Sequence, residues 1–117
     1  MNEDRKINYI EIPASDIKST KKFFEEVFRW TFADYGPEYI SFGNAGIYGG
    51  FYKSELKVNV DKGSPLIVIF ADELENIEKS IIEAGGSIKK AIFSFPGGRR
   101  FHFLDPNKNE YAVWSDK

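Results

Sequence analysis

The chain's single histidine, His102, lies in the stretch RRFHFLDPNKNEYAVW, which runs from Arg99 to Trp114. An imidazole can ligate a metal ion or exchange a proton near neutral pH. The planar guanidinium of Arg100, two residues earlier, is suited to bidentate binding of a carboxylate or phosphate. These residues therefore raise three possibilities for His102: a metal ligand, an acid–base group, or a strand residue without a chemical role.

Several other kinds of site are excluded by composition and motif. None of the 117 residues is a cysteine, so the chain has no disulfide, thiolate nucleophile or thiolate metal site. The glycine-rich FPGGRR at residues 95–100 lacks the Lys-Ser/Thr pair of a phosphate-binding loop. The G-x-S-x-G pattern of a serine hydrolase does not occur. A metal site would therefore depend on one histidine and on carboxylates.

Charge and hydropathy restrict the partners. The net charge is −2 and the basic residues are interspersed with acidic ones, which argues against nucleic-acid binding. No apolar run approaches the length needed to cross a membrane, and MNEDRKIN at the start lacks the apolar region of a signal peptide. We therefore expect a cytoplasmic protein. The 11 Phe, 6 Tyr and 2 Trp either fill the core or line an apolar pocket.

The first half of the chain has the pattern strand, helix and three strands. Residues 6–13 alternate as a strand does, and Ser15 or Asp16 can cap a helix that ends near Arg29. Three short strands follow, separated by glycine-containing turns. The apolar stripe of this helix consists of Ile17, Phe24, Val27 and Phe28.

The second half repeats this pattern after roughly 55–60 residues, which indicates an internal duplication. A strand at residues 65–72 precedes a helix that stops at Gly85-Gly86, and three more strands complete the half. The stripe of the second helix consists of Leu74, Ile77, Ile81 and Ala84. We expect a single domain over residues 1–117, with modules at about 6–53 and 65–116 and a linker at about 54–64.

Three segments carry a family resemblance: YIEIPASDIKSTKKFFEEVFRW (9–30), ELENIEKSIIEAGGSI (73–88) and GGRRFHFLDPNKNEYAVWS (97–115). In this order and spacing the chain resembles the vicinal-oxygen-chelate superfamily, which includes glyoxalase I, the bleomycin-resistance proteins and the extradiol dioxygenases. The resemblance implies an α+β fold of two βαβββ modules. Their curved mixed sheets would enclose a cavity, with one helix per module on the outer face. It also implies a homodimer.

Two positions depart from the usual pattern of the superfamily. Arg29, after the first helix, and Lys108, in the tight turn near the end, stand where glycine is usual. Glycine serves such places because it accepts positive φ freely. Each replacement should cost about 1 kcal/mol or change the turn.

By resemblance, the metal ligands of the superfamily come from the first and last strand of each module and are usually His and Glu. Those positions are here Tyr9, Gly49 or Gly50, Leu66 and Ala112. Glycine, leucine and alanine offer no donor side chain, and a phenol is a rare ligand, so this set is poor for a metal. We therefore expect a protein with no metal and no cofactor.

The turn at residues 105–109 sets the pairing of the last two strands. The expected pairs on one face are Leu104–Glu110, His102–Ala112 and Arg100–Trp114, and on the other Phe103–Tyr111 and Phe101–Val113. By resemblance, Ala112 marks the cavity side. The residues expected to face the cavity are then Tyr9, Glu11, Tyr48, Val68, Phe70, Arg100, His102 and Trp114.

Each of these residues has a functional and a plain interpretation. Arg100 can clamp an anion, while Trp114, Phe70 and Tyr48 can stack on a flat apolar ligand. His102 or Glu11 can act as a base, the carboxylate if burial raises its pKa. The plain interpretation pairs Arg100 with the Trp114 ring, leaves His102 solvated, and makes Glu11 the exposed partner of a lysine.

Three functions remain open. The leading hypothesis is a metal-free protein, similar to glyoxalase and bleomycin-resistance proteins, that binds a small, partly apolar, anionic organic molecule. The first alternative is a lyase or isomerase resembling glyoxalase I, with Glu11 or His102 as the base. The second is a structural or interaction module whose cavity is filled by its own side chains.

Overall fold

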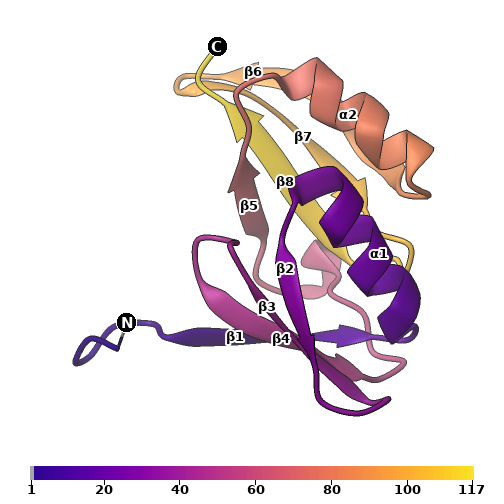
Figure 1. Ribbon diagram of the computed structural model, residues 1–117. Helices are drawn as coiled ribbons and strands as arrows, with labels where there is room; N and C mark the ends of the chain where they lie inside the picture. The colour runs from indigo at the N-terminus through magenta and orange to yellow at the C-terminus, as the bar shows by residue number, and fades with distance from the viewer. Residues whose placement is uncertain (1) are drawn as a thin grey trace. The chain divides into compact units, whose positions relative to one another are not determined.

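The protein, as a computed structural model, is described over residues 2–117, and its contacts divide it into module one, up to Leu56, and module two, from Lys57. Module one contains β1 (Tyr9–Ala14), α1 (Ile17–Phe28), β2 (Thr31–Asp34), β3 (Tyr39–Gly43) and β4 (Tyr48–Lys53). Module two contains the 3₁₀ turn η1 (Val60–Lys62), β5 (Ile67–Phe70), α2 (Leu74–Glu83), β6 (Ser87–Phe95), β7 (Gly98–Leu104) and β8 (Glu110–Ser115). The predicted α+β order of two βαβββ modules is confirmed (Figure 1).

Helix α1 begins and ends as its sequence predicts. The Asp16 side chain accepts a hydrogen bond from the Ser19 amide at 3.1 Å, which satisfies one of the unpaired amides of the first turn. Arg29 closes the helix with φ of 61°, the left-handed conformation expected where relatives carry glycine. The buried side chains of α1 are Thr20, Phe23, Phe24 and Val27, so the apolar stripe also includes Phe23, which the sequence analysis omitted.

The sheet of module one has the strand order β1-β4-β3-β2, with β1 parallel to β4 and the other pairs antiparallel. Helix α1 covers one face, where the Trp30 ring packs between Phe24 and Phe42 with centroid distances of 4.6 and 4.8 Å. No helix of the module covers the other face, which we call the helix-free face. The helix-free face of module one carries Tyr9, Glu11, Tyr39, Ser41, Tyr48 and Gly50.

The sheet of module two repeats this topology, with the order β5-β8-β7-β6 and β5 parallel to β8 (Figure 1). Below α2 lies a core of fully buried residues that includes Phe101, Phe103, Tyr111 and Val113. The predicted pairing of β7 with β8 is confirmed at every pair. The helix-free face of module two therefore carries Val68, Phe70, Phe93, Arg100, His102, Glu110, Ala112 and Trp114.

The turn between β7 and β8 is held by the buried carboxylate of Asp105. It accepts hydrogen bonds from the Asn107 amide at 2.8 Å, the Asn109 amide at 3.0 Å and the Tyr111 hydroxyl at 2.9 Å. Burial raises the pKa of Asp105 above its ordinary value, although these hydrogen bonds oppose the shift. Lys108 has φ of 71°, so the turn keeps the left-handed conformation despite the missing glycine.

The segment before β5 is tied to the start of β8. The Val58 amide donates to Asn109 Oδ1 at 2.8 Å, and the Glu110 amide donates to the Val58 carbonyl at 3.0 Å. Residues from Lys57 on therefore belong to module two by their contacts. Among the helices of residues 2–117, none is long and apolar enough to cross a membrane.

Candidate functional site in module two

A hydrogen-bonded network on the helix-free face of module two runs from the buried His102 and Glu110 to the exposed Asp61. His102, on β7, is 3% exposed, and its Nδ1 lies 2.9 Å from Glu110 Oε2 on β8. The other carboxylate oxygen of Glu110 accepts a hydrogen bond from Lys89 Nζ at 2.8 Å. Lys89 also donates to Asp61, in η1, at 2.9 Å. The alternative that His102 is a solvated strand residue is therefore wrong.

The hydrogen bonds of this network keep Glu110 negatively charged and Lys89 positively charged. Burial alone would raise the pKa of Glu110, but hydrogen bonds from Lys89 and His102 outweigh it and hold that pKa below its ordinary value. The same hydrogen bonds to Glu110 and Asp61 raise the pKa of Lys89. Glu110 is thus a carboxylate at neutral pH, and a carboxylate can only accept hydrogen bonds.

The ionised Glu110 determines which nitrogen of His102 carries the proton. Because the carboxylate has no proton to give, Nδ1 must donate, and Nε2 is then a lone pair in the neutral ring or an N–H in the imidazolium. Nε2 is buried and has no hydrogen-bond partner within residues 2–117. The ring is therefore oriented through Nδ1, while Nε2 stays unpaired within the described residues.

Arg100 lies beside His102 on the same face. The two residues are two positions apart on β7, which separates them by roughly 7 Å along the strand. The Arg100 guanidinium lies over the Phe93 and Phe95 rings, with its central carbon 5.3 and 5.9 Å from the ring centroids. Its Nε is buried and, like His102 Nε2, has no partner in the described chain. These two rings take the place that the plain interpretation of the sequence assigns to Trp114.

Further aromatic rings lie on the same face as Arg100 and His102. The Trp114 ring meets Phe70 at a centroid distance of 5.2 Å and Phe95 at 6.2 Å. Phe70 is 48% exposed and Val68, its neighbour on the same face, is 44% exposed. The face therefore combines a cationic group, an oriented imidazole and an exposed apolar surface.

The structure places the predicted site residues in two groups. Val68, Phe70, Arg100, His102 and Trp114 lie together on the helix-free face of module two. Tyr9, Glu11 and Tyr48 lie together on that of module one.

Sequence reasoning missed Glu110, Lys89, Phe93 and Phe95 as parts of the site in module two. A signal for Glu110 was present, because it shares a face with Ala112, and diagonal cross-strand neighbours lie within reach of long side chains.

In module one a hydrogen-bonded chain links two tyrosines to Glu11. The hydroxyls of Tyr9 and Tyr39 are 2.6 Å apart, and the Tyr39 hydroxyl donates to Glu11 Oε2 at 3.0 Å. Burial raises the pKa of Tyr39, and its hydrogen bonds to Tyr9 and Glu11 raise it further. Glu11 is exposed and has this phenol as its partner, where the plain interpretation expected a lysine.

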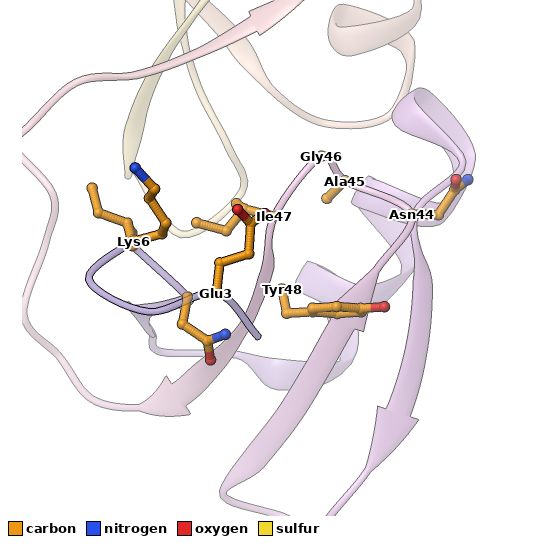
Figure 2. Close-up of a pocket in the computed structure, with 9 residues that line it drawn as sticks. Glu3, Lys6, Asn44, Ala45, Gly46, Ile47 and Tyr48 are labelled. Atoms are coloured by element: carbon orange, nitrogen blue, oxygen red, sulfur yellow. The ribbon is translucent and has the colours of Figure 1, made fainter. Parts of the chain in front are cut away.

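A pocket of about 350 Å³ lies at one end of this sheet, between the N-terminal segment and the turn before β4. Glu3 and Lys6 line it from the first segment, and residues 44–48 line it from the second. Figure 2 shows that the Tyr48 ring extends away from Glu3 and Lys6. The pocket thus has one acidic and one basic side chain, and the sequence analysis did not anticipate it.

Sequence comparison agrees with the fold. The family model of the glyoxalase/bleomycin resistance protein/dioxygenase superfamily matches residues 6–113. The chain belongs to this superfamily. No curated protein sequence matches the chain significantly.

Solved structures of the superfamily share the fold at low sequence identity. A family enzyme from Burkholderia phytofirmans PsJN has a TM-score of 0.78 at 16% identity, covering 94% of this chain and 98% of that one. The genomically encoded fosfomycin resistance protein of Listeria monocytogenes has a TM-score of 0.79 at 14% identity, covering 97% and 94%. A glyoxalase-related enzyme from Fulvimarina pelagi has 0.75 at 17% identity, covering 95% and 88%.

The residues at the expected metal positions of the superfamily do not fit a metal ion. Gly50, not Gly49, lies on the face of Tyr9, because Gly50 pairs with Glu11. A Cβ at Gly50 would meet the Tyr39 hydroxyl at 2.1 Å, so Tyr39 fills the place where a ligand side chain would begin. Ala112, on β8, has a hydrocarbon side chain and is fully buried. Across residues 2–117 no three His, Cys, Asp or Glu side chains come together as a metal-binding group.

Proposed function

We propose that the chain binds a small, partly apolar organic anion and needs neither a metal ion nor a cofactor to do so. The anionic group would lie against Arg100 and His102 on the helix-free face of module two. The apolar part would lie against Trp114, Phe70 and Val68.

One observation carries this proposal: on one face of β7 two buried nitrogens, Arg100 Nε and His102 Nε2, have no hydrogen-bond partner among residues 2–117. A buried polar group without a hydrogen-bond partner destabilises the folded state by about 1–3 kcal/mol, and this face has two such groups. A carboxylate or phosphonate would accept hydrogen bonds from the guanidinium and from the imidazolium. An anion is therefore the ligand that restores what the folded chain leaves unpaired.

A second candidate function is a lyase or isomerase with His102 as the base. It is favoured by Glu110, whose carboxylate orients the imidazole at 2.9 Å and leaves Nε2 to take a proton from a bound substrate. Glu11 is the other candidate base and stands in module one, hydrogen-bonded to Tyr39. An enzyme of this kind would convert its ligand, whereas a binding protein would release the ligand unchanged.

Tryptophan fluorescence can test binding directly, because Trp114 lies within the proposed site. The other tryptophan, Trp30, is buried under α1 and is removed by Trp30→Phe. In that background we expect benzoate and phenylphosphonate to change the emission of Trp114, and neutral benzamide to change it much less. Equal responses to the three probes would contradict recognition of the negative charge, and no response at millimolar concentration would favour the interaction module.

Elemental analysis tests the absence of a metal. We expect purified protein to contain zinc, nickel, manganese and iron well below one equivalent, and probe binding to survive dialysis against a chelator. A stoichiometric metal whose removal abolishes binding would overturn the metal-free part of the proposal and favour the enzyme.

A further inference from the structure

We infer that module one carries a tyrosine-lined groove that takes an alkylated organic cation such as a quaternary ammonium group. The groove has a volume of about 560 Å³. Four tyrosines line it: Tyr9, Tyr35, Tyr39 and Tyr48. It differs in place and in charge from the proposed anion site in module two.

The four tyrosines come from β1, the segment after β2, β3 and β4. Strand pairing places Tyr9 opposite Tyr48 on neighbouring strands. The Tyr35 and Tyr39 rings meet edge-on, 6.4 Å apart at 62°, and the Tyr35 amide donates to the Tyr39 carbonyl at 3.2 Å. Four tyrosine rings in one groove, two of them meeting edge-on, provide aromatic surface of the kind that binds quaternary ammonium ions.

These rings are unusually exposed for such large side chains. Tyr9, Tyr48 and Tyr35 are 42%, 57% and 68% exposed, although each carries a large apolar surface. The core does not need them, since α1 packs on the other face of this sheet against Phe42 and Phe51. Their exposure on one face is explained if they contact a ligand.

The charge of the groove favours a cation. The faces of the rings carry the negative end of their quadrupole. Because the Tyr39 hydroxyl donates its hydrogen bond to the Glu11 carboxylate, the Tyr39 oxygen is left to accept a hydrogen bond from the Tyr9 hydroxyl. These two hydrogen bonds place the negative charge of Glu11 next to the Tyr39 hydroxyl and polarise both hydroxyl groups toward it. Among the described residues no lysine or arginine lines the groove, and Lys6 lines the neighbouring pocket instead (Figure 2).

The groove suits an alkylated cation better than a bare ammonium. A bare ammonium brings three N–H donors that each need an acceptor on leaving water. Rings provide few such acceptors but ample apolar contact. A quaternary ammonium has no N–H to satisfy and gains from both the ring quadrupoles and the apolar surface.

The test compares choline with 3,3-dimethylbutan-1-ol, its neutral isostere, by calorimetric or NMR titration of the full chain. We expect choline to bind about fivefold tighter or better. Tyr35→Leu and Tyr48→Leu should each weaken choline binding about fivefold, and both side chains are exposed enough for the fold to survive. Tyr52→Leu, on the same strand as Tyr48 but outside the groove, is the matched control and should bind choline as the wild type does.

Equal affinity for choline and the neutral isostere would overturn the inference, because the groove would then be merely apolar. Absence of choline binding at millimolar concentration would also overturn it, as would an equal loss in Tyr52→Leu. Anion binding is measured with other probes and with variants of module two. Failure of one site is therefore distinguishable from failure of the other.

Discussion

At the scale of single residues, Glu110 decides what His102 can do. Its carboxylate accepts a hydrogen bond from His102 Nδ1 at 2.9 Å, and Lys89 Nζ donates to its other oxygen at 2.8 Å. The sequence predicted that His102 faces Ala112 and that Glu110 faces Leu104, both of which the structure confirms. It did not reveal the contact between them, because that contact depends on how a long side chain reaches diagonally across two strands.

Glu110 should make the free energy of unfolding decrease as the pH falls into the acidic range. Its pKa is held below the ordinary value of 4.5, so near that pH the unfolded chain binds its proton more readily than the folded chain. Its stabilising contribution is therefore complete above the ordinary pKa and is lost as the pH falls through the folded-state pKa. We expect Glu110→Gln to lower the free energy of unfolding by about 2–3 kcal/mol at pH 7, and the difference from wild type to shrink in acid.

Urea unfolding of both proteins at neutral and acidic pH measures this difference. Glu83→Gln, an exposed carboxylate at the end of α2, is the control and should follow the wild type. A difference between wild type and Glu110→Gln that stays constant or widens in acid would contradict the assignment.

At the scale of elements, the β7–β8 hairpin was predictable and the β6–β7 pair was not. The turn between β7 and β8 has a defined length, and turn length sets the register of a hairpin. Strand β6 shifts register twice, between Ile88 and Lys90 and between Lys90 and Phe93. Those irregularities have no clear pattern in the sequence, so the rings beneath Arg100 could not be assigned to Phe93 and Phe95.

Asp105 should be essential to the hairpin. Asp105→Ala would remove the acceptor for two backbone amides and the Tyr111 hydroxyl in a buried turn. We expect a loss of about 3 kcal/mol in the free energy of unfolding, measured by urea denaturation. Asp116→Ala, at an exposed position after β8, should change stability little. Similar losses in the two variants would show that the turn does not depend on this carboxylate.

Lys108 holds a left-handed conformation that glycine adopts without cost. With φ of 71° and an exposed side chain, Lys108→Gly should raise the free energy of unfolding by up to about 1 kcal/mol. Lys108→Ala keeps a Cβ and should give no gain, which makes it the matched control. Thermal unfolding of the three proteins measures the effect, and an equal change in Gly and Ala variants would exclude a conformational cause.

At the scale of the whole molecule, the two modules share a topology but differ in the chemistry of their helix-free faces. Module one presents tyrosines and Glu11, whereas module two presents Arg100, His102 and aromatic rings. The duplicated order of elements was predictable, because helix and strand periods repeat along the chain. The roles of Tyr39 and Glu110 were not, since both depend on side-chain contacts across strands.

Two statements about assembly stay predictions of the family resemblance: that the two sheets enclose a cavity and that the chain forms a homodimer. Sedimentation equilibrium addresses the second. The charge difference between the two faces does not depend on either statement, because each face is formed within its own module.

The most direct test of the proposed function is calorimetric titration of chelator-dialysed protein with benzoate, comparing Arg100→Gln with Arg99→Gln. Arg99 precedes Arg100 on β7 and lies on the opposite face of the sheet. Its guanidinium forms an ion pair with the exposed Glu75 at 2.6 Å. We predict that wild type and Arg99→Gln bind benzoate alike, and that Arg100→Gln binds about tenfold more weakly or worse. Equal binding by the two variants, or binding that disappears with the metal, would contradict a metal-free anion site at Arg100 and His102.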